Sequence, residues 1–135
     1  MTSARRIESF EEFWPFYVGE HRDPINRALH YAGTTMALGT VLVAAMTRRP
    51  RWLLLAPIVG YGPAWLGHFV FEGNKPATFQ YPLWSLMGDL KMLALALQGK
   101  MREEVERCCP TGTSTATSAE TSTGTSTASP TSTAN

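Results

Sequence analysis

The sequence predicts an all-α fold: a small integral membrane helical bundle with a central two-helix transmembrane hairpin, an N-terminal interfacial helix and a third short hydrophobic helix. The hairpin follows from two stretches, residues 28–47 and 52–71, which contain no Asp, Glu, Lys or Arg. Each stretch is about twenty residues long, and as a helix it covers about 30 Å, the thickness of a bilayer's hydrocarbon core. The short linker between them, residues 48–51, forces the two helices to run antiparallel.

A hairpin buried inside a soluble helical bundle is the alternative interpretation. The rest of the chain contains too few residues, many of them polar, to cover two helices that are apolar on all sides. We therefore interpret both stretches as membrane spans. The arginines of the linker predict a cytoplasmic loop and the basic residues on the opposite side predict the reverse, so the sequence leaves the orientation open. The expected location is the cytoplasmic membrane if the protein is bacterial and the endoplasmic reticulum membrane if it is eukaryotic.

The N-terminal helix is predicted from its cap and its aromatic face. Ser9 with Glu12 fits a capping box, and Phe10, Phe13 and Tyr17 share one face at i, i+3 and i+7 spacing. This face suits a helix that lies in the membrane interface. Packing of the same face against the ends of the hairpin explains the pattern equally well.

Small residues and prolines predict how the hairpin packs and bends. Gly33 with Ala37, and Gly60 with Ala64, are pairs of small residues four apart, which permit close contact between membrane helices. The second span also contains several residues that bend membrane helices, namely Pro57, Gly60, Gly62, Pro63 and Gly67. A kink just before His68 would open a slot for an acyl chain, or would simply improve the packing.

Residues 83–98 form the third helical candidate, which is short for a membrane span. It contains Asp89 and Lys91, so a short span, a re-entrant helix and an interfacial helix all remain open. Asp89 reaches the histidines of the hairpin only if this helix folds back to them. An ion pair of Asp89 with a basic residue at the interface is the plainer account.

Length and composition limit the function. The chain has 135 residues, a net charge of +1 and 17% charged residues, which makes it one domain and excludes a large multi-domain enzyme. The absence of a polybasic tract argues against nucleic acid as a partner. The only cysteines, Cys108 and Cys109, are adjacent, which excludes a disulfide framework and a four-thiolate zinc site. We expect inert thiols there, with reversible acylation as the alternative.

The C-terminal segment differs in composition from the rest of the chain. Residues 110–135 are almost only Thr, Ser, Ala, Gly and Pro, and such a segment cannot bury enough apolar surface to offset the entropy lost on ordering. We therefore divide the chain into a helical membrane domain, residues 1–109, and a disordered Thr/Ser-rich tail, residues 110–135.

The three histidines, His21, His30 and His68, are the residues that point to chemistry. Asp23 followed by Pro24 is typical of an N-cap and a first helical residue, so the first long helix begins there. His30 then lies near the start of the first span and His68 near the end of the second. Antiparallel packing puts both at the same depth, a few Å below one membrane surface. His21 lies just before the helix, on the same side of the membrane.

Two polar residues accompany these histidines at helical spacing. Asn26 lies four residues before His30, and Glu72 lies four residues after His68, so each pair shares a helix face. Neutral imidazoles with one carboxylate and open positions suit a ferrous ion that activates oxygen, and Asn26 would then orient a ligand or hold the substrate. The plainer account is that the histidines snorkel or cap carbonyl groups and that Glu72 is an exposed helix-end carboxylate.

The string His21-x4-Asn26-x3-His30, followed by Gly67-His68-x3-Glu72-x3-Pro76-Ala77, resembles a family of small membrane proteins long labelled a domain of unknown function. The yeast member of that family is a 2-hydroxy fatty acid dioxygenase of phytosphingosine degradation. Residues 13–17 and 82–86 look like its shorter, bacterial-type branch, and the resemblance covers residues 7–101.

The resemblance implies an iron(II)-dependent dioxygenase that acts by α-oxidation, so that a 2-hydroxy fatty acid and O2 give the acid one carbon shorter and carbon dioxide. His21, His30 and His68 are then the candidate iron ligands, Glu72 is a candidate carboxylate ligand or proton acceptor, and Asn26 is a supporting residue. The substrate's carboxylate and 2-hydroxyl would chelate Fe(2+) at headgroup level, with the tail in the bilayer. Two other functions remain as alternatives: a hairpin that binds haem through His30 and His68, and a non-catalytic membrane scaffold.

Overall fold

The structure is a computed structural model that describes residues 5–111, and every regular element in this part of the chain is helical. The predicted all-α fold is therefore confirmed. Two of the helical stretches, Pro24–Thr47 and Pro50–Glu72, are long and apolar enough to cross a membrane. The predicted disordered tail lies, from residue 112 on, outside the described residues.

Helix α1 (Phe10–Gly19) begins at the predicted cap, because the Ser9 hydroxyl accepts a hydrogen bond from the backbone N–H of Glu12 at 3.2 Å. Its aromatic face is largely buried. Phe13 and Tyr17 are 0% and 1% exposed, and the helix packs on α4 (Pro82–Leu97) and α5 (Met101–Cys108). The face packs inside the protein mainly against α4 and α5, and not against the ends of the hairpin as one interpretation has it. A position of α1 in the membrane interface stays a prediction.

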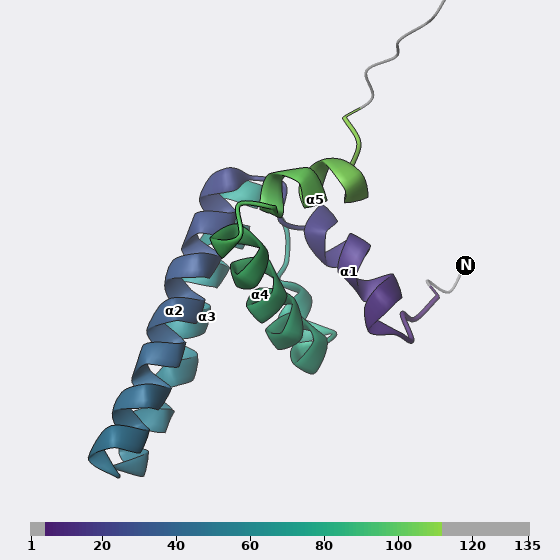
Figure 1. Ribbon diagram of the computed structural model, residues 1–135. Coiled ribbons are helices and arrows are strands. Elements are labelled where there is room, and N and C mark those ends of the chain that lie inside the picture. Colours follow the sequence, from purple (N-terminus) through teal and green to yellow (C-terminus); the bar gives the residue numbers. More distant parts are fainter. Residues whose placement is uncertain (1–4, 112–135) are drawn as a thin grey trace, which may run out of the picture.

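Helix α2 (Pro24–Thr47) and the second apolar stretch form the antiparallel hairpin, which is the longest feature in Figure 1. Arg48 ends α2 in the left-handed conformation, and the chain returns through a 3-10 turn, η1 (Pro50–Leu54), into α3 (Ala56–Leu66). Gly33 and Gly60 lie directly against each other, because a Cβ atom on Gly33 would be 2.4 Å from the carbonyl oxygen of Gly60. The small residues therefore bring the two backbones together.

The second stretch changes its helical form where the sequence predicts a kink. After α3 the backbone continues as a π-helix, η2 (Gly67–Glu72), which carries His68. π-Helical turns are rare and occur frequently at functional sites. Gly67 is required at this junction, since a Cβ atom there would lie 2.1 Å from Oδ1 of Asn26. The end of the second stretch is thus fitted closely against the start of α2.

Helix α4 runs back beside the hairpin, and its position relative to a membrane stays a prediction. After η2 the chain passes through a short 3-10 turn, η3 (Ala77–Phe79), and α4 starts partway along the hairpin. It then runs back to the end at which α2 begins, where α5 lies across it (Figure 1). The separate helix α5 is not predicted by the sequence. This return path brings the middle of α4 beside the start of α2.

The other end of the hairpin projects beyond the remaining helices (Figure 1). Met46, Leu54 and Ile58 are 76%, 76% and 66% exposed there, and only 17% of each apolar window in the two long helices is buried. A core helix of a soluble protein would be mostly covered. The exposure therefore favours a hairpin that faces lipid.

Candidate metal centre

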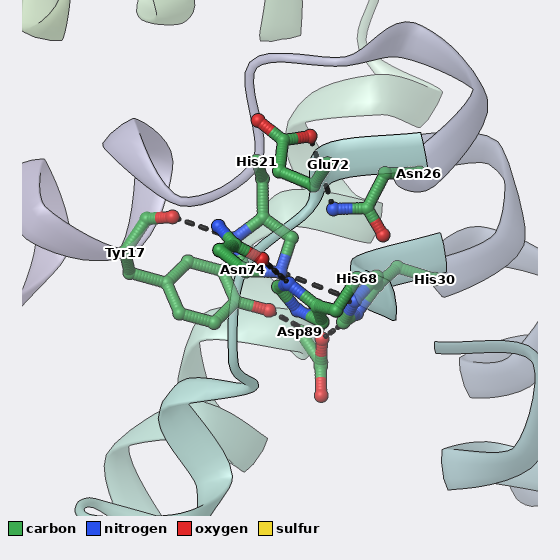
Figure 2. A network of polar contacts seen from close by, with 8 residues as sticks. All are labelled: Tyr17, His21, Asn26, His30, His68, Glu72, Asn74 and Asp89. Atoms are coloured by element: carbon green, nitrogen blue, oxygen red, sulfur yellow. Dashed lines mark hydrogen bonds and ion pairs between the residues drawn. The ribbon is translucent and has the colours of Figure 1, made fainter. Parts of the chain in front are cut away.

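Three imidazole rings meet where the α1–α2 connection, α2 and η2 come together (Figure 2). The Nε2 atom of His30 lies 3.1 Å from Nε2 of His21 and 3.1 Å from Nε2 of His68. One nitrogen from each ring lies within 4.8 Å of the others. The rings stand nearly perpendicular to one another, at interplanar angles of 83°, 76° and 90°.

The other nitrogen of each ring, Nδ1, lies against an oxygen atom. The pairs are His21 with the Tyr17 carbonyl oxygen at 2.6 Å, His68 with Asn74 Oδ1 at 2.6 Å, and His30 with Asp89 Oδ1 at 2.7 Å. Carbonyl and carboxylate oxygens can only accept, so each Nδ1 carries the proton and donates it. In the neutral rings, all three Nε2 atoms then present lone pairs to the centre.

The orientation of Asn74 is set by the end of α1. Its Nδ2 donates to the backbone oxygen of Glu20 at 3.1 Å and to Oε2 of the same residue at 2.7 Å. A flipped amide would lose both bonds and would turn N–H groups towards His68. Burial raises the pKa of Glu20, and the negative charge of Glu72 raises it further. Asn74 therefore ties His68 to the end of α1.

Asp89 is the charged residue in direct contact with the cluster. Its Oδ1 accepts hydrogen bonds from His30 and from the Tyr17 hydroxyl. Burial raises the pKa of Tyr17 well above its ordinary value, and Asp89 raises it further, so the hydroxyl keeps the proton that it donates. Among the described residues Asp89 forms no ion pair with a Lys or Arg side chain, unlike the interfacial pair expected from the sequence. Lys91 lies over the Trp14 ring, 4.1 Å from its centroid.

The cluster is closed off from solvent. His21, His30 and His68 are 0%, 5% and 1% exposed. Burial lowers the pKa of His21 well below its ordinary value, and the charges of the two neighbouring imidazoles lower it further. Histidine binds metal ions in the neutral form, so this environment favours the form that a metal requires.

A metal ion fits this set of donors. The three Nε2 lone pairs repel one another strongly in a site without water. One proton can bridge only two of these nitrogens, whereas a metal cation can bind all three. Two nitrogens bonded to one ion at about 2.1 Å lie about 3.0–3.4 Å apart for angles between 90° and tetrahedral. The two observed separations of 3.1 Å fall in this range. Hydrogen-bonded Nδ1 atoms are also the usual condition of metal-binding histidines.

A haem between His30 and His68 does not fit. Two axial imidazoles, each about 2.0 Å from the iron, would place their Nε2 atoms about 4 Å apart on opposite sides of the macrocycle. The observed separation is 3.1 Å, and His21 approaches the same point. The geometry therefore counts against the haem-binding alternative.

Glu72 and Asn26, the other two predicted site residues, lie beside the cluster (Figure 2). The Glu72 carboxylate accepts the backbone N–H groups of Arg22 and Asp23 at 2.9 and 2.8 Å, and Nδ2 of Asn26 at 3.3 Å. Oδ1 of Asn26 is buried without a hydrogen-bond partner among the described residues. Both Glu72 oxygens are thus engaged in holding the connection that carries His21 against the end of η2.

Three residues of this network are not predicted from the sequence: Tyr17, Glu20 and Asn74. Tyr17 lies four residues before His21, a spacing that could have indicated a contact through the last turn of α1. Asn74 follows the Gly73 turn, and its contact with Glu20 joins residues 54 apart in the chain. No local pattern indicates such a contact.

Comparison with known families gives a match over residues 7–101, a range that contains the three histidines and all of their hydrogen-bonding partners. The chain belongs to the Mpo1-like family. The family is described as 2-hydroxy-palmitic acid dioxygenase Mpo1-like, in agreement with the resemblance that the sequence analysis gives. Comparison with curated proteins and with solved structures gives no match. The family description indicates dioxygenase chemistry on a 2-hydroxy fatty acid.

Proposed function

We propose that this member of the Mpo1-like family is an iron(II)-dependent membrane dioxygenase, which converts a 2-hydroxy fatty acid and O2 into the fatty acid one carbon shorter. The observation that carries the proposal is the convergence of three buried Nε2 atoms whose rings are each held through Nδ1. Family membership supports the substrate class. The two long apolar helices support a location in the bilayer, where such a substrate dissolves.

The proposed reaction balances without a further reductant. One 2-hydroxy acid and one O2 give the shortened acid, one carbon dioxide and one water. Carbon 1 leaves as carbon dioxide and carbon 2 becomes the new carboxyl carbon, so four electrons pass from the substrate to O2. The absence of a nucleotide or flavin motif from the sequence is consistent with this balance.

Ferrous iron held by His21, His30 and His68 would activate O2 and attract the carboxylate and 2-hydroxyl of the substrate. The chain's own residues prepare this site. The acceptors on Nδ1 fix the tautomer of each ring and aim its Nε2 inwards. The negative charge of Asp89 on the Nδ1 side would make Nε2 of His30 a stronger electron-pair donor to the metal. The Tyr17 hydroxyl donates a hydrogen bond to the Asp89 carboxylate and so holds it in place.

In this proposal Glu72 and Asn26 are positioning residues. Glu72 binds two backbone N–H groups that directly follow His21 in the chain, and Asn26 donates to the same carboxylate. Together they hold the connection between α1 and α2 at the distance from η2 that the cluster requires. Their effect on the reaction would pass through the position of His21.

Turnover in detergent tests the proposal. Protein purified without metal is loaded with ferrous iron in the absence of oxygen, and 2-hydroxyhexadecanoic acid and O2 are then added. We expect pentadecanoic acid and carbon dioxide, both detected by mass spectrometry, with one product molecule for each O2 consumed. Lack of the shortened acid when bound iron has been confirmed would refute the proposal for this substrate.

A matched pair of variants separates catalysis from folding. Ser85 is buried one helical turn from Asp89, and its hydroxyl has no hydrogen-bond partner among the described residues, so Ser85→Ala should keep iron binding and turnover. His30→Ala should lose both, because it removes the central nitrogen of the cluster. A non-catalytic scaffold predicts instead that neither variant changes the fate of the fatty acid.

A further inference from the structure

An apolar groove runs between α2, α3 and α4, outside the histidine cluster. It encloses about 380 Å³. Thr34 and Val41 line it from α2, Ala56 from α3, and Leu86 and Asp89 from α4. Aliphatic side chains make up most of the lining, and Asp89 is its one charged residue. The groove is therefore suited to an aliphatic chain that has a polar group near one end.

One end of the groove adjoins the candidate metal centre. Asp89 lines the groove and also accepts the hydrogen bond from His30. Figure 2 shows one carboxylate oxygen turned towards the imidazoles and the other turned away from them. Thr34 follows His30 by four residues on α2, so the groove begins about one helical turn, or 5.4 Å, from the cluster.

The other end of the groove lies towards the projecting end of the hairpin. Thr34 and Val41 are seven residues apart on α2, which corresponds to about 10 Å along the helix. Ala56 stands opposite, at the start of α3. The groove thus leads from the histidines into the part of the hairpin whose side chains are exposed as a lipid-facing surface would be.

We propose that this groove binds the acyl tail of the substrate and that Val41 and Ala56 limit the length of tail that it accepts. This inference rests on the dioxygenase function proposed for the histidine cluster. Charge decides which end of the fatty acid lies where. Asp89 repels the substrate's carboxylate, whereas a cation between the imidazoles attracts it, so the head lies at the cluster and the tail in the groove.

A membrane lipid is the other source of an aliphatic chain. The groove offers one slot, which adjoins the histidine cluster through Asp89, and this continuity favours the tail of the substrate. A second groove on the opposite side of α2, which includes Met36, touches neither the histidines nor the acceptors of their Nδ1 protons. A lipid that merely fills apolar hollows would occupy both grooves without preference.

The length preference of the enzyme tests the proposal. Each methylene excluded from an apolar site lowers kcat/KM about fourfold, the equivalent of about 0.8 kcal/mol. Val41→Trp fills the far end of the groove, so kcat/KM should fall progressively for longer 2-hydroxy acids and remain close to wild type for shorter ones. Ala56→Leu fills the same end from α3 and should shift the preference in the same direction.

Met36→Trp is the matched control, because Met36 and Val41 lie on the same helix and are each 45% exposed. This variant should keep the wild-type length profile. Thermal unfolding of each variant in detergent identifies a change in folding, and a misfolded Val41→Trp protein leaves Ala56→Leu to decide. Identical length profiles for Val41→Trp, Ala56→Leu and Met36→Trp would overturn the proposal.

A binding experiment separates this proposal from the reaction itself. A 2-hydroxy fatty acid with a diazirine at its tail end is photo-crosslinked to the wild-type protein in detergent, and the modified residues are mapped by mass spectrometry. Crosslinks at Val41 and Ala56 support the groove even if no shortened acid forms, in which case only the proposed function fails. Crosslinks spread equally over Met36 and the groove residues would overturn it, whatever the turnover.

Discussion

Replacing Gly33 by Ala should push the two helices of the hairpin apart. The added Cβ atom would lie 2.4 Å from the carbonyl oxygen of Gly60, whereas contacts below 3.0 Å are essentially never seen. The neighbour is backbone and cannot rotate away, so the helices must separate by about 0.6 Å or tilt. Gly33 lies three residues after His30 on α2, so the same shift reaches the histidine cluster.

The size of the effect can be isolated by comparison with Gly39→Ala on the same helix. A Cβ atom on Gly39 would meet nothing within 4 Å. Both substitutions gain about 1 kcal/mol of helix propensity, and only Gly33→Ala adds an overpacking cost of about 1–3 kcal/mol. We therefore expect Gly39→Ala to unfold at a higher denaturant concentration than wild type and Gly33→Ala at the same or a lower one, with about 1–3 kcal/mol between the two variants.

Reversible unfolding in mixed micelles, followed by tryptophan fluorescence, measures this difference. A ferrous-iron titration of the same samples should show weaker binding by Gly33→Ala and unchanged binding by Gly39→Ala. Equal unfolding free energies for the two variants would refute the close approach of α2 and α3. Equal iron affinities in the presence of a stability difference would show that the hairpin contact does not set the spacing of the imidazoles.

Three further predictions concern single carboxylates. Asp89→Asn should weaken iron binding about 10–100-fold in a titration, because it removes the charge behind a metal-binding imidazole, whereas Ser85→Ala should not. Glu72→Gln keeps only one acceptor oxygen for the backbone N–H groups of Arg22 and Asp23. Those amides should therefore exchange hydrogen faster in the metal-free protein, and the free energy of unfolding should fall by about 1–3 kcal/mol. A hydrogen bond from Arg107 lowers the pKa of Glu104 to about 2, so the stability that this carboxylate contributes is present above its ordinary pKa and should be lost as pH falls towards 2.

Each of these predictions has a result that would contradict it. Iron affinity that falls equally in Asp89→Asn and Ser85→Ala would indicate a general packing defect in α4. Unchanged amide exchange in Glu72→Gln would show that the carboxylate does not hold the His21 connection. For Glu104 the comparison is with Glu104→Gln, whose free energy of unfolding should fall by about 1 kcal/mol less than that of wild type on acidification. Parallel acid unfolding curves for the two proteins would argue against the contact of Glu104 with Arg107.

The sequence alone determines the features that depend on neighbouring residues. Two long uncharged stretches with a short linker predict the hairpin, and Ser9 and Asp23 predict where the first two helices begin. The spacing of His30 and His68 from the turn predicts that they reach the same end of the hairpin, because antiparallel helices of equal rise pair residues equidistant from the loop. These inferences need only helix geometry and the thickness of the bilayer's hydrocarbon core.

The tertiary structure alone decides what surrounds the imidazoles. The contact of Asp89 with His30 joins residues 59 apart, and that of Tyr17 with Asp89 joins residues 72 apart. Both depend on the path of α4 back to the start of α2, which no local pattern encodes. Glu72 shares a helix face with His68 in sequence, yet η2 turns its carboxylate to the N–H groups of the α1–α2 connection. Packing between elements, rather than propensity within them, therefore determines that Asp89 contacts the imidazoles and that Glu72 contacts the backbone.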